Sequence, residues 1–217
     1  MNSNFIKEFK SKISLNVEQR NIIVGSILGD GCLETQSNGR TYRLKIEQSL
    51  LHKDYVDWLY AKLKNLVLTE PREKKKRIME KKYQNYGFQT ISCGNLRFFA
   101  QQFYDKNSKN KKIPKNIGRL LNPLALTVWF MDDGQIKSKK HRALLINSQC
   151  FSKNDLKLLQ DALKNKFGIE TTLKKEKTGY RIYLLSKTIH KFLAVIKPYI
   201  IPSMEYKLGR INTLPKR

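Results

Sequence analysis

The stretch "LTVWFMDDGQI", residues 126–136, is an apolar run that ends in two adjacent carboxylates and a glycine. A second stretch, "IIVGSILGDGCLE" at residues 22–34, closes its apolar run in the same way, at Asp30-Gly31. Both runs are typical of buried helices, and a carboxylate beside a buried surface is unfavourable unless something binds it. The fold and the function of this chain depend on what binds these carboxylates.

The charge of the chain narrows the choice of partner. Its 217 residues include 43 Lys and Arg against 18 Asp and Glu, a formal net charge of +25. Such a surplus favours a polyanion, and nucleic acid is the expected partner. No stretch has the length and freedom from charge of a membrane-spanning helix, and the N-terminal residues lack the apolar core of a secretory signal.

The cysteines and histidines do not indicate a zinc site. Cys32, Cys93 and Cys150 are odd in number and widely spaced, without a CxxC pair, and the three histidines are scattered. We interpret the cysteines as reduced interior thiols of a protein in a reducing compartment.

The chain contains an internal repeat. "QSLLHKDYVDWLYAKLKN" (48–65) aligns with "QCFSKNDLKLLQDALKNK" (149–166), and Asp30 aligns with Asp133. Hydrophobic periodicity predicts the same order of elements in each half. In the first half the predicted elements are a strand at 42–49, a helix at 52–67, strands at 71–79 and 84–92, and a helix at 94–104. In the second half they are a strand at 141–150, a helix at 152–168, strands at 169–176 and 179–185, and a helix at 187–197.

The repeat predicts an α+β fold of two pseudo-symmetric αββαββα halves. The first half covers residues 1–104, a basic linker covers 105–120, and the second half covers 121–217. We expect the two Asp-ending helices to pair at the interface and the two sheets to form a concave, DNA-binding saddle. Asp30 and Asp133 would then converge at the bottom of a positively charged groove.

Facing carboxylates in such a groove suit divalent cations. Mg²⁺ takes hard oxygen ligands, usually one or two carboxylates with water and substrate phosphate. Bound beside a phosphodiester, it can activate water and stabilise the departing oxygen. Either Asp-Gly alone could equally be a helix stop before a hairpin, but two in matching positions favour a catalytic pair, with one acid for each DNA strand.

The two stretches also resemble a known family. "IVGSILGDG" (23–31) and "LTVWFMDDG" (126–134) are similar to the motif of LAGLIDADG homing endonucleases of the single-chain, two-motif, intron-encoded kind. They depart from it at Leu28 and Val128. "IKPYIIPSMEYKL" (196–208) resembles the closing segment of that subgroup, so the resemblance covers nearly the whole chain.

The resemblance implies a monomeric, site-specific endonuclease that makes a staggered cut in double-stranded DNA. Its target would be a long, non-palindromic intron-insertion site, and its cofactor Mg²⁺, with Mn²⁺ as a substitute. The implied metal ligands are Asp30 and Asp133, assisted by the carbonyls of Gly29 and Asp132. The family's habit places the protein in an organelle, either a chloroplast or a mitochondrion.

The family also surrounds its metals with lysines and polar groups. The implied catalytic positions are Lys207, one of the adjacent residues Lys111 and Lys112, and Glu47, with Gln149 or Glu176 as weaker candidates in the second half. Each of these lysines could instead be ordinary basic surface, and Glu47 and Gln149 could be hairpin residues or DNA contacts.

The polar faces of the predicted strands supply basic residues for phosphates and base edges. The candidate DNA contacts are Arg40, Arg43, Lys45, Arg72, Lys74, Lys76, Lys137, Lys139, Arg142, Lys174 and Arg181.

Two alternatives stay open on the sequence alone. The first is an RNA maturase on the same scaffold, which binds its host group I intron RNA and assists splicing. The second is a basic nucleic-acid-binding protein without catalysis. The two motif acids argue against the second, because a protein that only binds gains nothing from carboxylates near phosphate.

Overall fold

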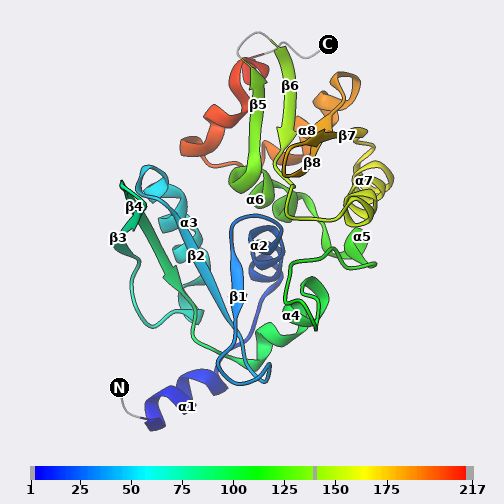
Figure 1. Ribbon diagram of the computed structural model, residues 1–217. Coiled ribbons are helices and arrows are strands. Elements are labelled where there is room, and N and C mark those ends of the chain that lie inside the picture. The colour runs from blue at the N-terminus through cyan, green and yellow to red at the C-terminus, as the bar shows by residue number, and fades with distance from the viewer. Residues whose placement is uncertain (1–2, 139–140, 214–217) are drawn as a thin grey trace. The chain divides into compact units, whose positions relative to one another are not determined.

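The computed structural model describes residues 3–138 and 141–213. The chain divides into two units, Met1–Gln101 (unit 1) and Gln102–Arg217 (unit 2). Each unit contains one four-stranded antiparallel sheet together with helices (Figure 1). This confirms the predicted α+β class.

Unit 1 follows the predicted order of helix, two strands, helix, two strands and helix. Its sheet has the strand order β1-β2-β4-β3. The elements are α1 (Ser3–Ser11), α2 (Val17–Leu28), β1 (Cys32–Glu34), β2 (Arg43–Ser49), α3 (Lys53–Leu63), β3 (Arg72–Ile78), β4 (Lys81–Gln89) and α4 (Arg97–Phe103), which crosses into unit 2.

Unit 2 repeats that order, and its sheet has the equivalent strand order β5-β6-β8-β7. Its elements are α5 (Ile117–Leu120), α6 (Pro123–Asp133), β5 (Gly134–Ser138), β6 (His141–Ile146), α7 (Lys153–Phe167), β7 (Thr171–Glu176), β8 (Gly179–Leu184), α8 (Ile189–Ile196) and the 3₁₀ segment η5 (Pro202–Thr213). The matching connectivity of the two sheets confirms the internal repeat.

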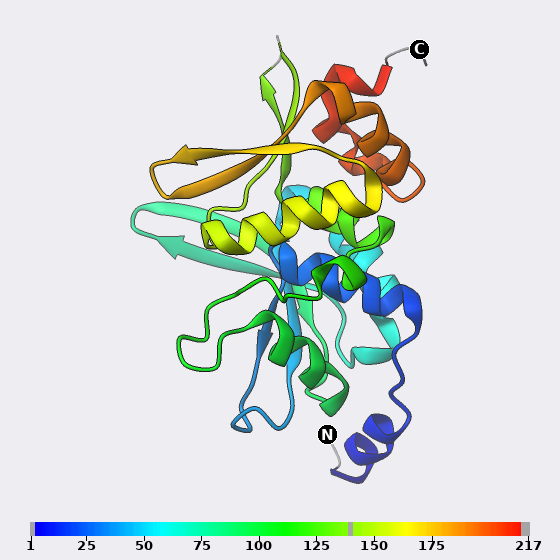
Figure 2. The ribbon, with the colours of Figure 1, turned by 90° about the vertical axis from the view of Figure 1, so that its right-hand side faces the viewer.

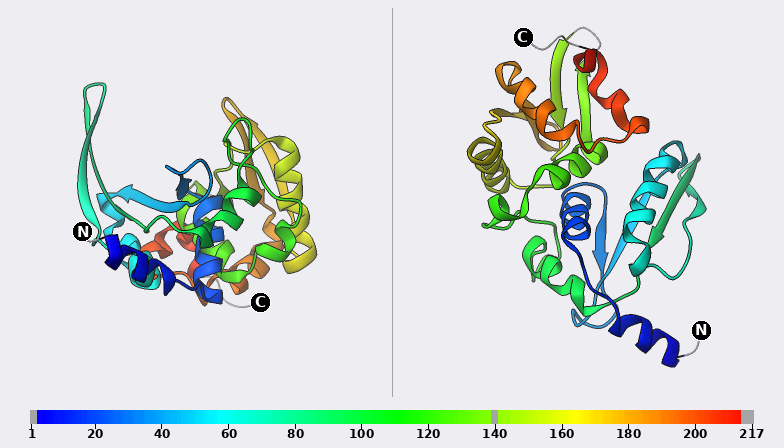
Figure 3. Two further views of the ribbon diagram at one scale, coloured as in Figure 1. Left: turned by 90° about the horizontal axis from the view of Figure 1, so that it is seen from below. Right: turned by 180° about the vertical axis from the view of Figure 1, so that it is seen from behind.

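The strands of unit 1 have one apolar and one charged face. On β2, Leu44 and Ile46 are buried, while Arg43, Lys45 and Glu47 are only half-buried. The alternation follows from the two-residue period of a strand, and it predicts which side chains share a face. The β3–β4 hairpin extends away from the rest of this sheet (Figure 3).

The motif-bearing parts of helices α2 and α6 are buried on all sides. In α2 every residue from Ile22 to Leu28 is buried, and in α6 every residue from Leu124 to Met131 is buried. Both helices begin at an asparagine cap: Asn16 forms a capping box with Gln19, and the Asn122 side chain accepts a hydrogen bond from the Ala125 amide. A helix that is apolar all round is expected to be buried, as predicted from the sequence.

Some boundaries differ from the prediction. The predicted strand 84–92 begins earlier, at Lys81, because the hairpin turns at Met79-Glu80, where Met79 has a φ of 54°. That turn has none of the Gly or Asn residues that usually indicate one. The predicted strand 141–150 ends at Ile146, although the Asn147 amide still donates to the carbonyl of Asp133 at 3.0 Å, and the chain turns at 149–150.

The prediction that all cysteines are interior was wrong for one of them. Cys93 is buried and Cys32 is half-buried, but Cys150 is exposed in the connection after β6. None of these three cysteines forms a disulfide. Within the described residues, none of the helices combines the length and apolar character needed to cross a bilayer.

Residues 105–120 contact α7 within unit 2. The Ile113 amide donates to Asp155 Oδ1 at 3.2 Å, and Lys166 Nζ donates to the Gly118 carbonyl at 3.1 Å. The predicted role of this segment as a basic linker, and the predicted boundaries of the two halves, stay predictions.

We predict that Gly134→Ala destabilises the protein. A Cβ at this position would lie 2.2 Å from a ring carbon of Phe130 and 2.5 Å from its carbonyl oxygen, so the buried ring and the backbone would both have to move. Overpacking of this kind lowers the free energy of unfolding by about 1–3 kcal/mol, to be measured by urea denaturation.

The matched control for this variant is Gly118→Ala. An added Cβ at Gly118 meets no heavy atom within 4 Å. Because alanine favours a helix over glycine by up to about 1 kcal/mol, this change is expected to be neutral or slightly stabilising. Equal free energies of unfolding for the two variants would contradict the prediction, because the Phe130 ring would then move aside at no cost.

Candidate active site and nucleic-acid interface

Asp30 lies at a tight junction between α2 and β1. The Gly29 amide closes the last helical turn on Gly25, and the Gly31 amide donates to the Ser26 carbonyl at 2.8 Å. A Cβ on Gly31 would lie 2.9 Å from both the Cβ and the carbonyl oxygen of Ser26. The junction therefore requires glycine directly after the acid, and it leaves Asp30 itself exposed.

Gln48 is bonded to this acid. Its Nε2 donates to Asp30 Oδ2 at 2.9 Å. Gln48 follows Leu44 and Ile46 at two-residue spacing, so it lies on their face of β2, opposite the basic face. Gln48 was not among the candidate site residues predicted from the sequence. Its alignment with the candidate Gln149 in the internal repeat is the sequence feature that could have identified it.

The second motif acid lies at an equivalent junction. Asp133 ends α6, and the buried Gly134 begins β5 directly after it. Lys207 Nζ donates to the carbonyl of Asp132 at 2.7 Å. A cation at the C-terminal end of a helix is favourable, because the last carbonyls carry partial negative charge. The structure thus places the predicted Lys207 beside the residue that precedes Asp133.

The register of the second sheet corrects the alignment of the repeat. Cys32 and Gln135 each lie two residues after the motif aspartate, and they pair with Lys45 and Leu145 respectively. Counting three residues onward from Lys45 and from Leu145, the structural equivalent of Gln48 is Ser148, not Gln149. Ser148 is fully buried, and its hydroxyl donates to the Tyr180 carbonyl at 3.0 Å.

Glu47 is held on the basic face of the first sheet. Its two carboxylate oxygens accept from Lys74 Nζ and Asn85 Nδ2, each at 2.9 Å. Because Glu47 and Gln48 are consecutive strand residues, their side chains leave opposite faces of β2. Glu176 is one of the two weaker candidates of the second half, and its Oε1 lies 3.9 Å from Arg181 Nη1. Catalytic roles for both glutamates stay predictions.

Lys111 and Lys112 are both half-buried within unit 2. Lys111 forms an isolated β-bridge with Tyr104, and the Lys112 amide donates to the Phe103 carbonyl at 2.8 Å. Successive residues of an extended segment point to opposite sides, so only one of the two can face a given site. The choice between them stays open.

The acids fit Mg²⁺ better than a cation that needs a cage of protein ligands. Among the described residues, no group of three or more His, Cys, Asp or Glu side chains lies close enough to hold a metal. Mg²⁺ needs only one or two carboxylates, since water and substrate phosphates complete its shell. The Asp132 carbonyl, a predicted ligand, already accepts from Lys207 and has one further lone pair.

Part of the basic face of the first sheet is neutralised internally. Arg43 Nη2 lies 2.8 Å from Glu34 Oε2, and Lys45 Nζ lies 3.5 Å from Glu34 Oε1. Burial raises the pKa of the Glu34 carboxyl, but the hydrogen bond from Arg43 and the charges of both cations outweigh it, so the pKa is lowered overall. These two cations are therefore held in place by an acid of the same sheet.

The basic face of the second sheet concentrates positive charge. Lys174 on β7 lies directly opposite Arg181 on β8, and like charges in that position destabilise a sheet. The ammonium of Lys174 lies 4.8 Å from the centre of the Tyr183 ring. The Nε of Arg181 is buried without a hydrogen-bond partner in the described part of the chain. An anion on this face would relieve the repulsion between Lys174 and Arg181.

The other candidate DNA contacts are described to different extents. Arg40, Arg72 and Lys137 are exposed. Lys139 lies outside the described residues. The structure describes the backbone of Lys76 on β3 and of Arg142 on β6, but not their side chains.

Comparisons with known proteins agree with these features. The model of the LAGLIDADG DNA endonuclease family matches residues 20–192. The DNA endonuclease I-ChuI of Chlamydomonas applanata is 35% identical over 215 residues, which cover 92% of this chain and 98% of that protein. Cytochrome b mRNA maturase bI2 of Saccharomyces cerevisiae is 34% identical over 206 residues, which cover 90% of this chain and 48% of the maturase. The chain therefore spans about half the length of that relative.

Solved structures are similar as well. The homing endonuclease I-WcaI, bound to its DNA recognition sequence, has a TM-score of 0.88 and 26% identity, and the match covers 95% of this chain and 93% of that one. The structure of I-DmoI in complex with DNA and Mn has a TM-score of 0.50 and 19% identity, and the match covers 83% of this chain and 97% of that one. This second likeness shows the fold alone.

We predict that Glu34→Gln makes stability less dependent on pH in the acid range. A carboxyl whose pKa is lowered by folding stabilises the protein above its ordinary pKa of 4.5, and this contribution is lost as the pH falls through that range. The variant is therefore expected to have a lower free energy of unfolding at neutral pH and a shallower decline between about pH 5 and about pH 3.

Urea denaturation at a series of pH values measures both effects. Arg43→Gln removes the partner and is expected to flatten the same limb of the curve. Curves for wild type and Glu34→Gln that run parallel would contradict the assignment of the lowered pKa to this ion pair.

Proposed function

Because the chain belongs to the LAGLIDADG DNA endonuclease family, we propose that it is a site-specific double-strand DNA endonuclease. Its target is a long, non-palindromic intron-insertion site, in which it makes a staggered cut by Mg²⁺-dependent hydrolysis. One observation carries the proposal: each repeated half has an aspartate at the end of its buried motif helix or two residues after it, directly before a glycine that has no room for a side chain.

Asp30 and Asp133 are the proposed metal-binding carboxylates, assisted by the carbonyls of Gly29 and Asp132. When bound, Mg²⁺ supplies a Lewis acid for the phosphate and lowers the pKa of its water. Mn²⁺ is the proposed substitute, and the Mn-containing complex of I-DmoI, which shares the fold, is consistent with it. One acid serves each DNA strand, so the chain acts as a monomer.

The chain's own residues orient the acids and stabilise charge. Gln48 holds the Asp30 carboxylate through its hydrogen bond, which fixes the direction of the remaining oxygen lone pairs. Lys207, beside Asp133, and one of Lys111 and Lys112 are the proposed cations for the scissile phosphates. A preorganised cation needs no reorientation as charge develops on the phosphate.

The basic faces of the two sheets are the proposed DNA-binding surface. They differ in residues and in internal ion pairs, which suits a target without two-fold symmetry. The pairing of α2 with α6 and the saddle formed by both sheets stay predictions. The likeness to I-WcaI, solved on its recognition DNA, supports them. We also propose an organellar location, in a chloroplast or a mitochondrion, by analogy with intron-encoded relatives.

A second candidate function is RNA maturation. The similarity to cytochrome b mRNA maturase bI2 covers 90% of this chain at 34% identity, nearly the same as the similarity to the DNA endonuclease. In this role the host intron RNA would be a partner in addition to, or in place of, DNA.

A cleavage assay tests the proposed function. The protein is incubated with Mg²⁺ and a DNA fragment that contains the intronless insertion site, and we expect two staggered cuts. Removal of the metal with EDTA should stop cleavage. Asp30→Asn and Asp133→Asn are each expected to slow double-strand cleavage at least about a hundredfold, since each removes several kcal/mol of charge stabilisation.

Binding measurements are the control for these variants. Both should retain the wild-type affinity for the same DNA in Ca²⁺, because neither contributes to the basic faces. Cutting of both strands at the wild-type rate by either variant would refute the assignment of the acids. Absence of cleavage by wild type, with splicing of the host intron improved, would favour the maturase.

DNA affinity should depend steeply on salt. If about 6–10 of the basic side chains neutralise phosphates, affinity is expected to fall at least about a thousandfold between about 50 and about 200 mM salt. Arg72→Gln, at an exposed position of β3, should reduce the slope of log affinity against log salt by about one. Lys187→Gln, whose parent lysine pairs with Glu170 outside the strands, should leave the slope unchanged.

A further inference from the structure

The outer part of the β3–β4 hairpin has basic residues on both of its faces. Lys74 on β3 lies on the basic face of the first sheet, where its Nζ donates to Glu47 Oε2 at 2.9 Å. Successive strand residues leave opposite faces, so Lys75 and Arg77 lie on the reverse face. Lys82 on β4 pairs directly with Arg77, which places it on the reverse face as well. We call Lys75, Arg77 and Lys82 the reverse-face cluster.

The reverse-face cluster lies beyond the helix that covers this side of the sheet. Helix α3 contacts β4 at Tyr86, whose hydroxyl donates to Asp57 Oδ1 at 3.0 Å. Further along β4, Gln84 and Lys82 are exposed. The hairpin, drawn in teal, continues well past α3 in the side view (Figure 2). Solvent therefore reaches both faces of its outer part.

The charge of the reverse-face cluster is not neutralised within the protein. Arg77 lies directly opposite Lys82, and like charges in that position destabilise a sheet. All three cations are exposed, and none forms an ion pair within the part of the chain that the structure describes. An acid on the same face, Glu73, lies at the inner end of the hairpin, opposite Tyr86. An anion bound between Arg77 and Lys82 would relieve their repulsion.

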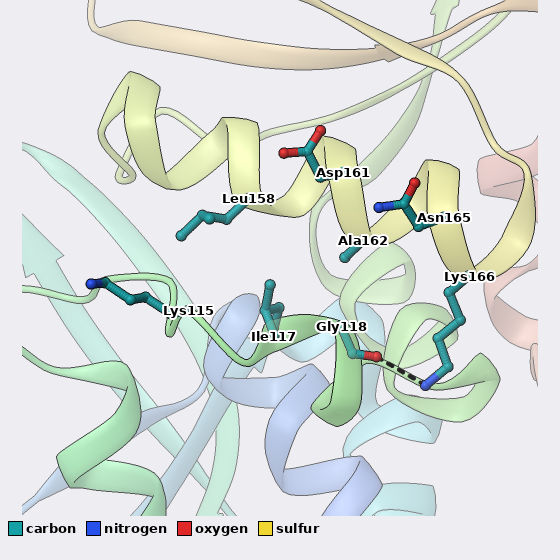
Figure 4. A pocket seen from close by; sticks show the side chains of 8 residues that line it. All are labelled: Lys115, Ile117, Gly118, Leu158, Asp161, Ala162, Asn165 and Lys166. Carbon is teal, nitrogen blue, oxygen red and sulfur yellow. Dashed lines mark hydrogen bonds between the residues drawn. The ribbon is translucent and has the colours of Figure 1, made fainter.

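Basic side chains in unit 2 are used differently. Helix α7 runs alongside the equivalent hairpin, β7–β8 (Figure 2), and the Lys153 ammonium on this helix lies 5.6 Å from the centre of the Tyr180 ring. Lys166 of the same helix donates to the Gly118 carbonyl at 3.1 Å, beside the pocket between α7 and the residues that lead into α5 (Figure 4). These lysines contact their own unit, whereas the reverse-face cluster extends from a two-stranded ribbon into solvent.

The reverse-face cluster suits a phosphate backbone rather than bases. The exposed ring of Tyr83 lies on the opposite, basic face, since Tyr83 pairs with Lys76. The outer reverse face therefore presents ammonium, guanidinium and amide groups, and its described residues offer no aromatic ring for stacking of an unpaired base. Duplex DNA carries a negative charge for every ~1.7 Å of its axis, so three cations spaced about 5–7 Å apart can each reach a phosphate.

We propose that the reverse-face cluster binds the phosphate backbone of a second DNA duplex while the basic face of the same sheet holds the target. The proposal rests on the proposed DNA-binding role of the basic face. Because the two faces point in opposite directions, a duplex on one face leaves the other accessible. Phosphate contacts carry no sequence information, so the second duplex can have any sequence. A protein that holds two duplexes can pass from one to the other without dissociating into solution.

A two-duplex capture assay tests the proposal. Target DNA that contains the intronless insertion site is immobilised on beads, and the protein is bound to it in Ca²⁺. A fluorescein-labelled duplex of unrelated sequence is then titrated in, and the fluorescence retained on the beads is measured. Wild type should retain the labelled duplex. Retention no greater than on beads without protein would overturn the proposal.

Lys75→Gln/Arg77→Gln/Lys82→Gln removes the reverse-face cluster and leaves the basic face intact. This triple variant should capture the labelled duplex at least about tenfold more weakly. The slope of log affinity against log salt for this duplex should fall by about three, since three phosphate contacts are lost. Cleavage of the target in Mg²⁺ should be unchanged. A loss of target affinity as large as the loss of capture would overturn the proposal, because both faces would then bind one duplex.

The matched control is Lys7→Gln/Lys64→Gln/Lys157→Gln, an equal change of charge at exposed positions outside the strands. The control should retain the labelled duplex nearly as well as wild type does. Equal losses of capture in the two triple variants would overturn the proposal, because capture would then follow net charge alone.

Gln84→Glu gives an independent test, which also serves if the triple variant does not fold. Gln84 lies directly opposite Lys75, so a carboxylate at this position would pair with the lysine and compete with a phosphate. The salt slope for the labelled duplex should fall by about one, while target cleavage stays at the wild-type rate. An unchanged slope would contradict the role of Lys75.

Two further arms separate the outcomes. Unlabelled duplex DNA should displace the labelled duplex at a lower concentration of charge than polyglutamate or single-stranded RNA, because its charges are closer together. Equal displacement by all three would overturn the assignment to duplex DNA. If wild type does not cleave the target but the triple variant still lowers the salt slope of capture, the nuclease proposal fails and the reverse-face assignment stands.

Discussion

Two glycines without room for a side chain determine how the chain presents its acids. Gly31 approaches Ser26, and Gly134 approaches the Phe130 ring, so closely that even a methyl group would collide. Each glycine lets a buried helix lead into a strand with at most three residues between them. The residue before it, Asp30 or Asp133, is thereby held close to the end of a buried helix rather than on a long loop. Catalytic groups on rigid elements are positioned more accurately than groups on loops.

The two halves share this junction but not its surroundings. In unit 1 a glutamine from the neighbouring strand bonds to Asp30, whereas the equivalent residue of unit 2 is Ser148, which is turned into the core. Unit 2 instead places a lysine from its C-terminal segment beside the end of α6. Duplication therefore preserved the backbone that carries the acid, while the side chains around each acid diverged. Such divergence is compatible with a target whose two halves differ.

The basic residues of this protein fall into two physical groups. On the first sheet, Arg43 and Lys45 share Glu34, and Lys74 pairs with Glu47, so these side chains are held in fixed directions. Others, such as Arg40, Arg72 and Lys137, are exposed. Net charge alone, which indicates nucleic acid as the partner, does not distinguish the two groups.

The amino-acid pattern by itself determined the repeat, the buried motif helices and the alternation of β2, because these follow from local patterns of residue type. It also placed Asp30, Asp133 and Lys207 among the candidates, through the motifs and the resemblance. It aligned the second half one residue away from its structural register, missed Gln48, and expected Cys150 to be buried. Only the tertiary structure decided which side chains bond to the Asp30 carboxylate and to the Asp132 carbonyl, because these hydrogen bonds join residues 18 and 75 positions apart. Strand register and packing, which bring such distant residues together, follow from the whole fold rather than from any local stretch.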